Sequence, residues 1–206
     1  MQIIKLTLGA LDTNCYILYD PETKEAAVID PADEDVKIID TIKNYNLKVK
    51  YIIVTHAHID HILALDKVSQ YTNASLVIHS DDKDALNNDV FNLATFFNAK
   101  SPSKKADILV KNGDVLHLGE NNLKIIHTPG HNRGSMCIHV DDILISGDTL
   151  FNQSIGRTDY YGGNFDTLIN SIKKRLFVLD DNTKVYPGHG CETTIGYEIN
   201  NNPFIR

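Results

Sequence analysis

Three histidines and one aspartate occupy six positions directly after an apolar run of the chain. The run covers residues 51–54, and a continuous apolar stretch of this kind predicts a strand buried on both faces. The polar cluster that follows consists of His56, His58, Asp60 and His61. In sheets flanked by helices, ligands commonly bind where strands end. The cluster therefore predicts a binding site at a strand end, the alternative being a set of solvated loop histidines.

The spacing within the cluster indicates metal binding. His56 and His58 stand two residues apart, so both reach one metal ion only if the backbone turns tightly. Asp60 and His61 begin a predicted helix over residues 59–70, point elsewhere and can serve a second ion. Imidazole and carboxylate groups suit zinc, iron and manganese.

Three further polar residues follow other predicted strands. His131 lies in a Pro-Gly turn, Asp148 ends an apolar strand, and His189 lies in a second Pro-Gly turn. Together with the first cluster, they place four ligand-bearing segments at four predicted strand ends. His127 lies four residues before His131 and is expected either to support the site or to hydrogen-bond to backbone.

Short apolar runs in both halves predict a β-rich fold. Strands are expected at residues 3–8, 15–19, 26–29, 51–54, 76–78, 115–118, 123–126, 136–140, 143–145 and 184–186. Helices are expected from about residue 30, at 59–70, at 165–177 and from about residue 193. In the first helix, Val36, Ile39 and Ile42 are the expected apolar face. Two β-rich halves, each closed by helices, predict a single domain over residues 1–206, with sheet packed on sheet and helices outside.

The segment 81–106 reads as helical but irregular. Its apolar residues Phe91, Leu93, Phe96 and Phe97 are expected to pack on the body of the protein rather than to form a lid. Neither the role of this segment nor that of Cys191 follows from the sequence.

Composition excludes several classes of protein. A net charge of −7 over 206 residues gives no basic stripe for nucleic acid. The sequence contains no apolar run near the roughly 20 residues of a membrane span and no signal-peptide pattern, so no membrane partner is expected. Three cysteines are too few and too scattered for a disulfide framework, which favours a reducing, cytoplasmic location.

Four segments in this order, residues 55–61, 128–135, 147–151 and 186–190, resemble the metallo-β-lactamase fold superfamily. Within it, the chain is similar to the glyoxalase II-like (hydroxyacylglutathione hydrolase) group, in a short form without the C-terminal helical domain. The resemblance covers nearly the whole chain. It implies an α+β fold, an αββα sandwich of two packed mixed β-sheets flanked by helices.

The resemblance also implies a site for two divalent metal ions, with zinc expected first and iron or manganese as alternatives. His56, His58 and His131 would hold metal one; Asp60, His61 and His189 would hold metal two; Asp148 would bridge them. A hydroxide shared by the metals would attack a thioester carbonyl. Asp60 would have a second, catalytic role in orienting that nucleophile.

The implied substrate is a small-molecule thioester, such as the S-(2-hydroxyacyl)glutathione S-lactoylglutathione. Arg157 falls where the group has a substrate-binding lysine, and Tyr160 lies next to Asp159, which replaces the group's tyrosine. One alternative is a mononuclear iron persulfide dioxygenase of the same fold, using His56, His131 and Asp148. Another is a lactonase or other ester hydrolase. The acyl group, the thiol carrier and the oligomeric state stay open.

Overall fold

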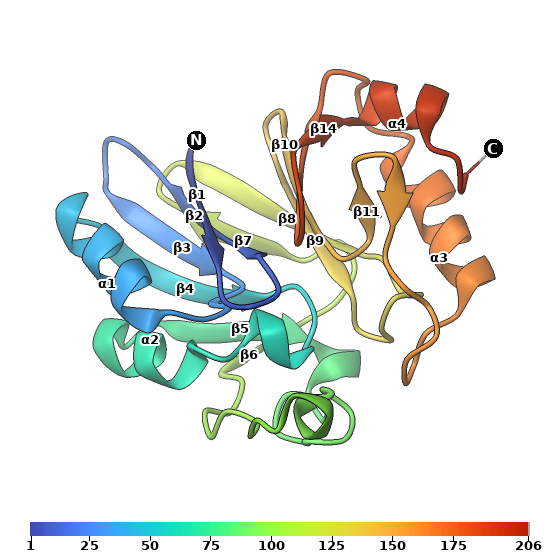
Figure 1. Cartoon of the computed structure of the whole chain (residues 1–206). Helices are drawn as coiled ribbons and strands as arrows, with labels where there is room; N and C mark the ends of the chain where they lie inside the picture. The colour runs from blue at the N-terminus through green and yellow to red at the C-terminus, as the bar shows by residue number, and fades with distance from the viewer. Residues whose placement is uncertain (206) are drawn as a thin grey trace.

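Two six-stranded sheets lie face to face, with helices on their outer faces, in the computed structural model, which describes residues 1–205 (Figure 1). Three clusters of buried apolar residues match these layers. One lies between the first sheet and its helices, one between the two sheets, and one between the second sheet and its helices. The predicted αββα sandwich is confirmed.

The first sheet has the strands in chain order. They are β1 (Gln2–Leu8), β2 (Thr13–Tyr19), β3 (Glu25–Ile29), β4 (Lys48–Val54), β5 (Ser75–His79) and β6 (Ile108–Val110). The first three strands are antiparallel, and β3 to β6 run parallel to one another. The parallel strands β3, β4 and β5 therefore end at the same edge, where the histidine cluster begins.

The second sheet has the order β14-β13-β10-β9-β8-β7. Its strands are β7 (Val115–Leu118), β8 (Asn121–His127), β9 (Met136–Val140), β10 (Ile143–Gly147), β13 (Lys184–Pro187) and β14 (Thr193–Thr194). Among the neighbouring strands of this sheet, only β10 and β13 run parallel to each other, so their carboxyl ends also share one edge. The strands β11 (Leu150–Phe151) and β12 (Ser154–Ile155) form a small separate hairpin.

Two helices cover each sheet. They are α1 (Asp35–Asn44) and α2 (Leu65–Thr72) on the first sheet, and α3 (Phe165–Ser171) and α4 (Ile195–Asn201) on the second (Figure 1). A π-turn, η4 (Ile172–Leu176), extends α3. Three 3₁₀ turns are η1 (Ile59–His61), η2 (Ser80–Asp82) and η3 (Ala94–Phe97). No helix among residues 1–205 is long and apolar enough to cross a membrane.

Burial in β4 explains its continuous apolar sequence. Ile52 and Val54 pack toward the helices, whereas Ile53 packs between the two sheets. Both faces of the strand are therefore covered, as its sequence predicted.

The helix expected at residues 165–177 is confirmed by α3 and η4, but two other helical predictions were less accurate. The helix expected over residues 59–70 begins only at Leu65, because Ile59–His61 form the separate 3₁₀ turn η1. In α1, the buried residues are Ile38 and Ile42, whereas Val36 is 64 % exposed. The prediction was therefore confirmed for Ile42 and wrong for Val36, and it missed Ile38.

The segment 81–106 holds no α-helix, only η2, η3 and turns. Asn and Asp side chains accept backbone hydrogen bonds there: Asn88 from Val90 and Phe91, and Asp89 from Ser101. Such local bonds compete with a helical backbone. Leu93 is buried as expected, but Phe96 is 76 % exposed and Phe97 is 49 % exposed, so core packing was the wrong prediction for these two.

Candidate metal centre

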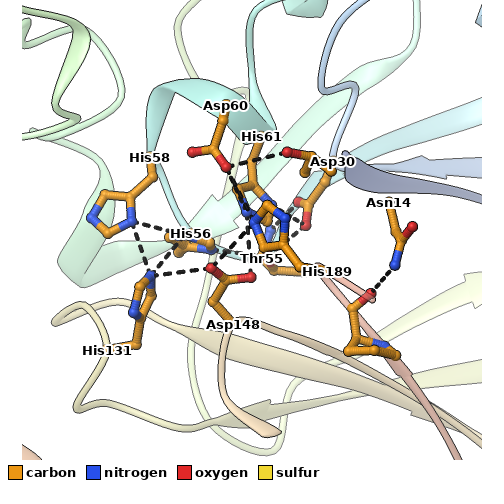
Figure 2. A network of polar contacts seen from close by, with 12 residues as sticks. Asn14, Asp30, Thr55, His56, His58, Asp60, His61, His131, Asp148 and His189 are labelled. Carbon is orange, nitrogen blue, oxygen red and sulfur yellow. Dashed lines mark hydrogen bonds and ion pairs between the residues drawn. The ribbon is translucent and has the colours of Figure 1, made fainter. Parts of the chain in front are cut away.

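All seven residues predicted to bind metal lie together at the edge where both sheets end (Figure 2). The first four follow β4, two of them on η1. His131 lies in the loop between β8 and β9, Asp148 directly after β10, and His189 two residues after the end of β13. Asp148 follows a register shift between Ile145 and Gly147, and an irregularity of this kind re-aims the next side chain.

The first ligand group consists of His56, His58 and His131. His131 Nε2 lies 3.2 Å from His56 Nε2 and 2.9 Å from His58 Nδ1, and those two nitrogens are 3.1 Å apart. Three nitrogens on a tetrahedral zinc ion would be separated by about 3.3 Å, given Zn–N bonds near 2.05 Å. The triangle is close to that size.

The second ligand group consists of Asp60, His61 and His189. Asp60 Oδ2 lies 3.5 Å from His61 Nε2 and 3.2 Å from His189 Nε2. Thr13 donates a hydrogen bond of 3.2 Å to the same oxygen. The carboxylate is thereby aimed at the two imidazoles.

Asp148 reaches both groups. Its Oδ1 lies 3.4 Å from His61 Nε2, and its Oδ2 lies 3.6 Å from both His131 Nε2 and His189 Nε2 (Figure 2). Gly188 allows this approach, because a Cβ there would lie 2.2 Å from Asp148 Oδ1 and 2.8 Å from His61 Cε1. One carboxylate thus spans the two ligand groups.

The far ring nitrogens of three histidines are held by acceptors. His131 Nδ1 donates to the carbonyl of Arg157 at 2.7 Å, His189 Nδ1 to that of Leu11 at 3.1 Å, and His61 Nδ1 to Asp30 Oδ2 at 2.9 Å. With the proton on Nδ1, each Nε2 would present its lone pair to a metal ion at the centre. Support of this kind is typical of metal-ligating histidines.

Asp30 is a residue that the sequence analysis missed. Its carboxylate accepts from His61 and also from the backbone N–H and the hydroxyl of Thr55, each at 2.7 Å. Asp30 follows β3 and Thr55 follows β4, and these strands are parallel neighbours. Their shared edge was a usable signal, because polar residues after adjacent parallel strands meet there.

Asn14 and Asp82 position backbone segments and were also missed. Asn14 donates through Nδ2 to the carbonyls of Pro187 at 2.9 Å and Gly190 at 3.0 Å, which fixes the turn that carries His189. Asp82 is buried and accepts from the backbone N–H of Ala57 at 2.8 Å and from that of Gly134. It therefore ties the His56 segment to the His131 loop.

The protonation states at neutral pH differ between the two ligand groups. Burial lowers the pKa of His56 and of His131, and lowers that of His58 to about 3, so these imidazoles are neutral. Burial opposes ionisation of Asp60, but His61 and His189 beside it lower its pKa to about 2. Burial lowers the pKa of His61 and of His189, but the carboxylates of Asp60 and Asp148 outweigh it and raise both pKa values above the ordinary range. Neutral imidazoles are the forms that bind metal, so an ion in the second group would displace protons from these two histidines.

Two buried atoms test whether the residues fit a metal. Among the described residues, His61 Nε2 and Asp148 Oδ1 are buried without a hydrogen-bond partner, although they lie 3.4 Å apart. Buried polar atoms are rarely left without a partner, and a divalent cation between them would satisfy both. The donor set of five imidazoles and two carboxylates suits zinc, iron or manganese. The residues therefore fit the binding of divalent metal ions.

The predicted substrate contacts lie beside the first ligand group. The Arg157 carbonyl holds His131, and the ring of Tyr160 lies 6.0 Å from that of His58. The Arg157 guanidinium is exposed, makes two hydrogen bonds to Asp159 at 3.0 and 2.7 Å, and lies 4.4 Å above the Tyr160 ring. The guanidinium that was predicted to contact substrate is thus paired with Asp159 in this structure.

The remaining histidine and cysteine predictions have simple outcomes. His127 Nε2 donates to the Arg133 carbonyl at 2.8 Å, two residues from His131, so it supports that loop through a backbone contact. Its ring stacks on His79 at 3.8 Å. Cys191 is exposed, while Cys15 and Cys137 are buried in strands as expected.

Comparisons with known proteins agree with this geometry. A family model described as the metallo-beta-lactamase superfamily matches residues 8–189. The hydroxyacylglutathione hydrolase GloC of Haemophilus influenzae is 33 % identical, over 100 % of this chain and 98 % of that protein.

Two crystal structures are similar over nearly the whole chain. BLEG-1, described as a B3 metallo-beta-lactamase, is 36 % identical, with a TM-score of 0.95 and 99 % of both chains covered. A di-iron-bound form of TTHA1623 is 30 % identical, with a TM-score of 0.86 over 98 % of this chain and 99 % of that one. The fold, the family match and the paired ligand groups lead to one conclusion: the chain belongs to the metallo-beta-lactamase superfamily and is a metal-dependent hydrolase of that superfamily.

Proposed function

We propose that this protein hydrolyses thioesters of small thiols, with S-(2-hydroxyacyl)glutathione compounds such as S-lactoylglutathione as the first substrates to test. The observation that carries the proposal is the pair of ligand groups spanned by Asp148. A site for two ions suits hydrolysis, because two divalent metals lower the pKa of a bound water and polarise the carbonyl under attack. The relation to GloC supports the choice of substrate, and the relation to the di-iron form of TTHA1623 supports two metals.

The residues of the chain have distinct parts in this proposal. His56, His58 and His131 would hold one ion, Asp60, His61 and His189 the other, with Asp148 between them. Thr13 fixes Asp60, and the fixed carboxylate would orient the attacking water by accepting its hydrogen bond. The thiolate that leaves needs little assistance from an acid, because its pKa lies near 8.5.

Arg157 and Tyr160 are proposed contacts for the thiol carrier. Arg157 would exchange its bonds to Asp159 for a carboxylate of the carrier, and Tyr160 offers a ring face beside His58. We place the reaction in the cytoplasm, where small thiols are kept reduced, because Cys15, Cys137 and Cys191 are all free.

The test is hydrolysis of S-lactoylglutathione by protein of measured metal content. We expect about two metal ions per chain, zinc first, with release of lactate and free thiol. His58→Ala should lower kcat/KM more than about 100-fold and reduce the metal content, since it removes a ligand. His117→Ala is the matched control, because His117 lies on β7, exposed and outside the centre. Full activity of H58A with unchanged metal would refute the assignment.

Two other activities of this fold are separate outcomes of the same panel. The relation to BLEG-1 favours a test of β-lactam hydrolysis, which would replace the thioesterase proposal if only β-lactams or lactones were cleaved. About one iron ion per chain, with oxygen uptake on a glutathione persulfide and no hydrolysis, would indicate the dioxygenase alternative.

A further inference from the structure

We propose that an apolar pocket beside Asp60 binds an aliphatic acyl group of several carbons, so that the preferred thioesters carry acyl groups larger than lactoyl. This inference rests on the proposed thioesterase function. The pocket has a volume of about 310 Å³, at the lower end of the range for ligand pockets. It lies between the β1–β2 loop, η1 and the residues around η3.

The lining of the pocket includes one member of the second ligand group and two residues that hold members of that group in place. Asp60 itself lines the pocket, and so does Thr13, which donates to its Oδ2. Leu11 also lines it, and the Leu11 carbonyl accepts from His189 Nδ1. A group in this pocket therefore lies directly beside the residues proposed to hold a metal and the attacking water.

The lining is mostly apolar and partly exposed. Ile59 is buried at one wall, whereas Leu11, Leu63 and Phe97 expose nearly half of their surface each. Large apolar side chains gathered around a hollow beside a polar centre mark a binding site for an apolar group. Phe97 belongs to the segment whose side chains were expected in the core.

The two sides of the centre differ in chemistry, which assigns the two halves of a thioester. The cation and ring of Arg157 and Tyr160 lie beside the first ligand group and suit a polar, anionic thiol carrier. The pocket lies beside the second group, and its lining includes Asp33 and no cationic residue, so it offers nothing to pair with an anionic carrier. The uncharged acyl group is the half that fits the pocket.

The activity test is a series of acyl-glutathione thioesters from acetyl to octanoyl. We expect kcat/KM to rise about fourfold for each methylene that enters the pocket, the value that corresponds to burial of one such group. Ala99 also lines the pocket. Ala99→Phe, which would fill the pocket, should lower kcat/KM for octanoyl at least tenfold and leave acetyl nearly unchanged. Phe97→Ala should act in the same direction by removing a wall. Phe96→Ala is the control, because Phe96 is 76 % exposed and does not line the pocket.

A binding test separates failure of the pocket from failure of the reaction. S-octylglutathione and S-methylglutathione are thioethers that cannot be hydrolysed, so their affinities can be measured by calorimetry even if no thioester is cleaved. We expect the octyl compound to bind at least tenfold more tightly to the wild type, and A99F to abolish the difference. Equal affinities, or a flat acyl series in an active enzyme, would overturn the inference.

Discussion

Asp82 shows how a single buried carboxylate can work against stability while organising a site. Burial raises its pKa from the ordinary 3.8 to about 6, although N–H groups of Ala57 and Gly134 lower it in part. Between these two values the folded chain binds more protons at Asp82 than the unfolded chain does. The contribution of Asp82 to the free energy of unfolding therefore falls as pH rises from about 4 to 6, by at most about 3 kcal/mol.

Asp82→Asn tests this pH dependence. In metal-free protein, the difference in free energy of unfolding between variant and wild type should move in favour of the variant from about pH 4 to pH 7. Urea denaturation at a series of pH values measures it. Asp84→Asn, on the exposed surface of the same segment, controls for the removal of a charge without burial. Parallel curves for D82N and the wild type would contradict the prediction.

At the scale of elements, the His131 loop and α3 are joined by backbone contact at Gly130. Its φ is +135°, and a Cβ there would lie 2.3 Å from the backbone nitrogen of Leu168. The Gly130 carbonyl accepts from the N–H of Asn164, the residue that caps α3. The loop that carries a predicted ligand is thus held by the start of a helix.

Gly130→Ala should destabilise the metal-free protein more than Gly113→Ala does. Gly113 also has a positive φ, of +90°, but no atom lies within 4 Å of its added Cβ. G113A should cost about 1–2 kcal/mol for the backbone conformation, and G130A at least about 2 kcal/mol more, because backbone atoms must also shift. Thermal unfolding measures both. Equal losses of stability in G130A and G113A would show that α3 moves away from the added methyl group at little cost.

How far sequence predicts an element depends on where its hydrogen bonds are made. Strands such as β4 were predicted well, because their apolar pattern reports burial directly. The segment around η3 was predicted poorly. Its turns depend on backbone hydrogen bonds that the side chains of Asn88 and Asp89 accept, and these bonds leave no periodic pattern in the sequence. The seven predicted ligands were found together because each follows a strand. Asp30 was missed although it too follows a strand, whereas Asn14 lies inside β2 and its partners at Pro187 and Gly190 follow from no local pattern.

At the scale of the molecule, each ligand group joins the two sheets. His56 and His58 follow β4 of the first sheet, while His131 belongs to the second; Asp60 lies on η1 beside the first, while His189 follows β13. A metal ion in either group would therefore hold the sheets together at this edge. Metal at about 1,000 times its dissociation constant adds about 4 kcal/mol to stability.

Removal of metal by a chelator should accordingly lower the Tm by roughly 8–16 °C, and zinc should restore it. Scanning fluorimetry of the purified protein measures the change. H117A should show the full shift, whereas His189→Ala should show part of it, since one ligand group is left intact. A Tm that changes with neither chelator nor zinc would argue against a metal ion between the sheets.

The position of the ligands along the chain also orders their arrival during synthesis. All members of the first group are present once residue 131 has been made, but the second group waits for His189. At about 5–20 residues per second, the intervening 58 residues (189 − 131) take roughly 3–12 seconds. During that interval a nascent chain carries four of the five proposed ligand histidines and lacks only His189 among them. A chain cut between these points would leave the first group complete and remove His189 from the second without any substitution.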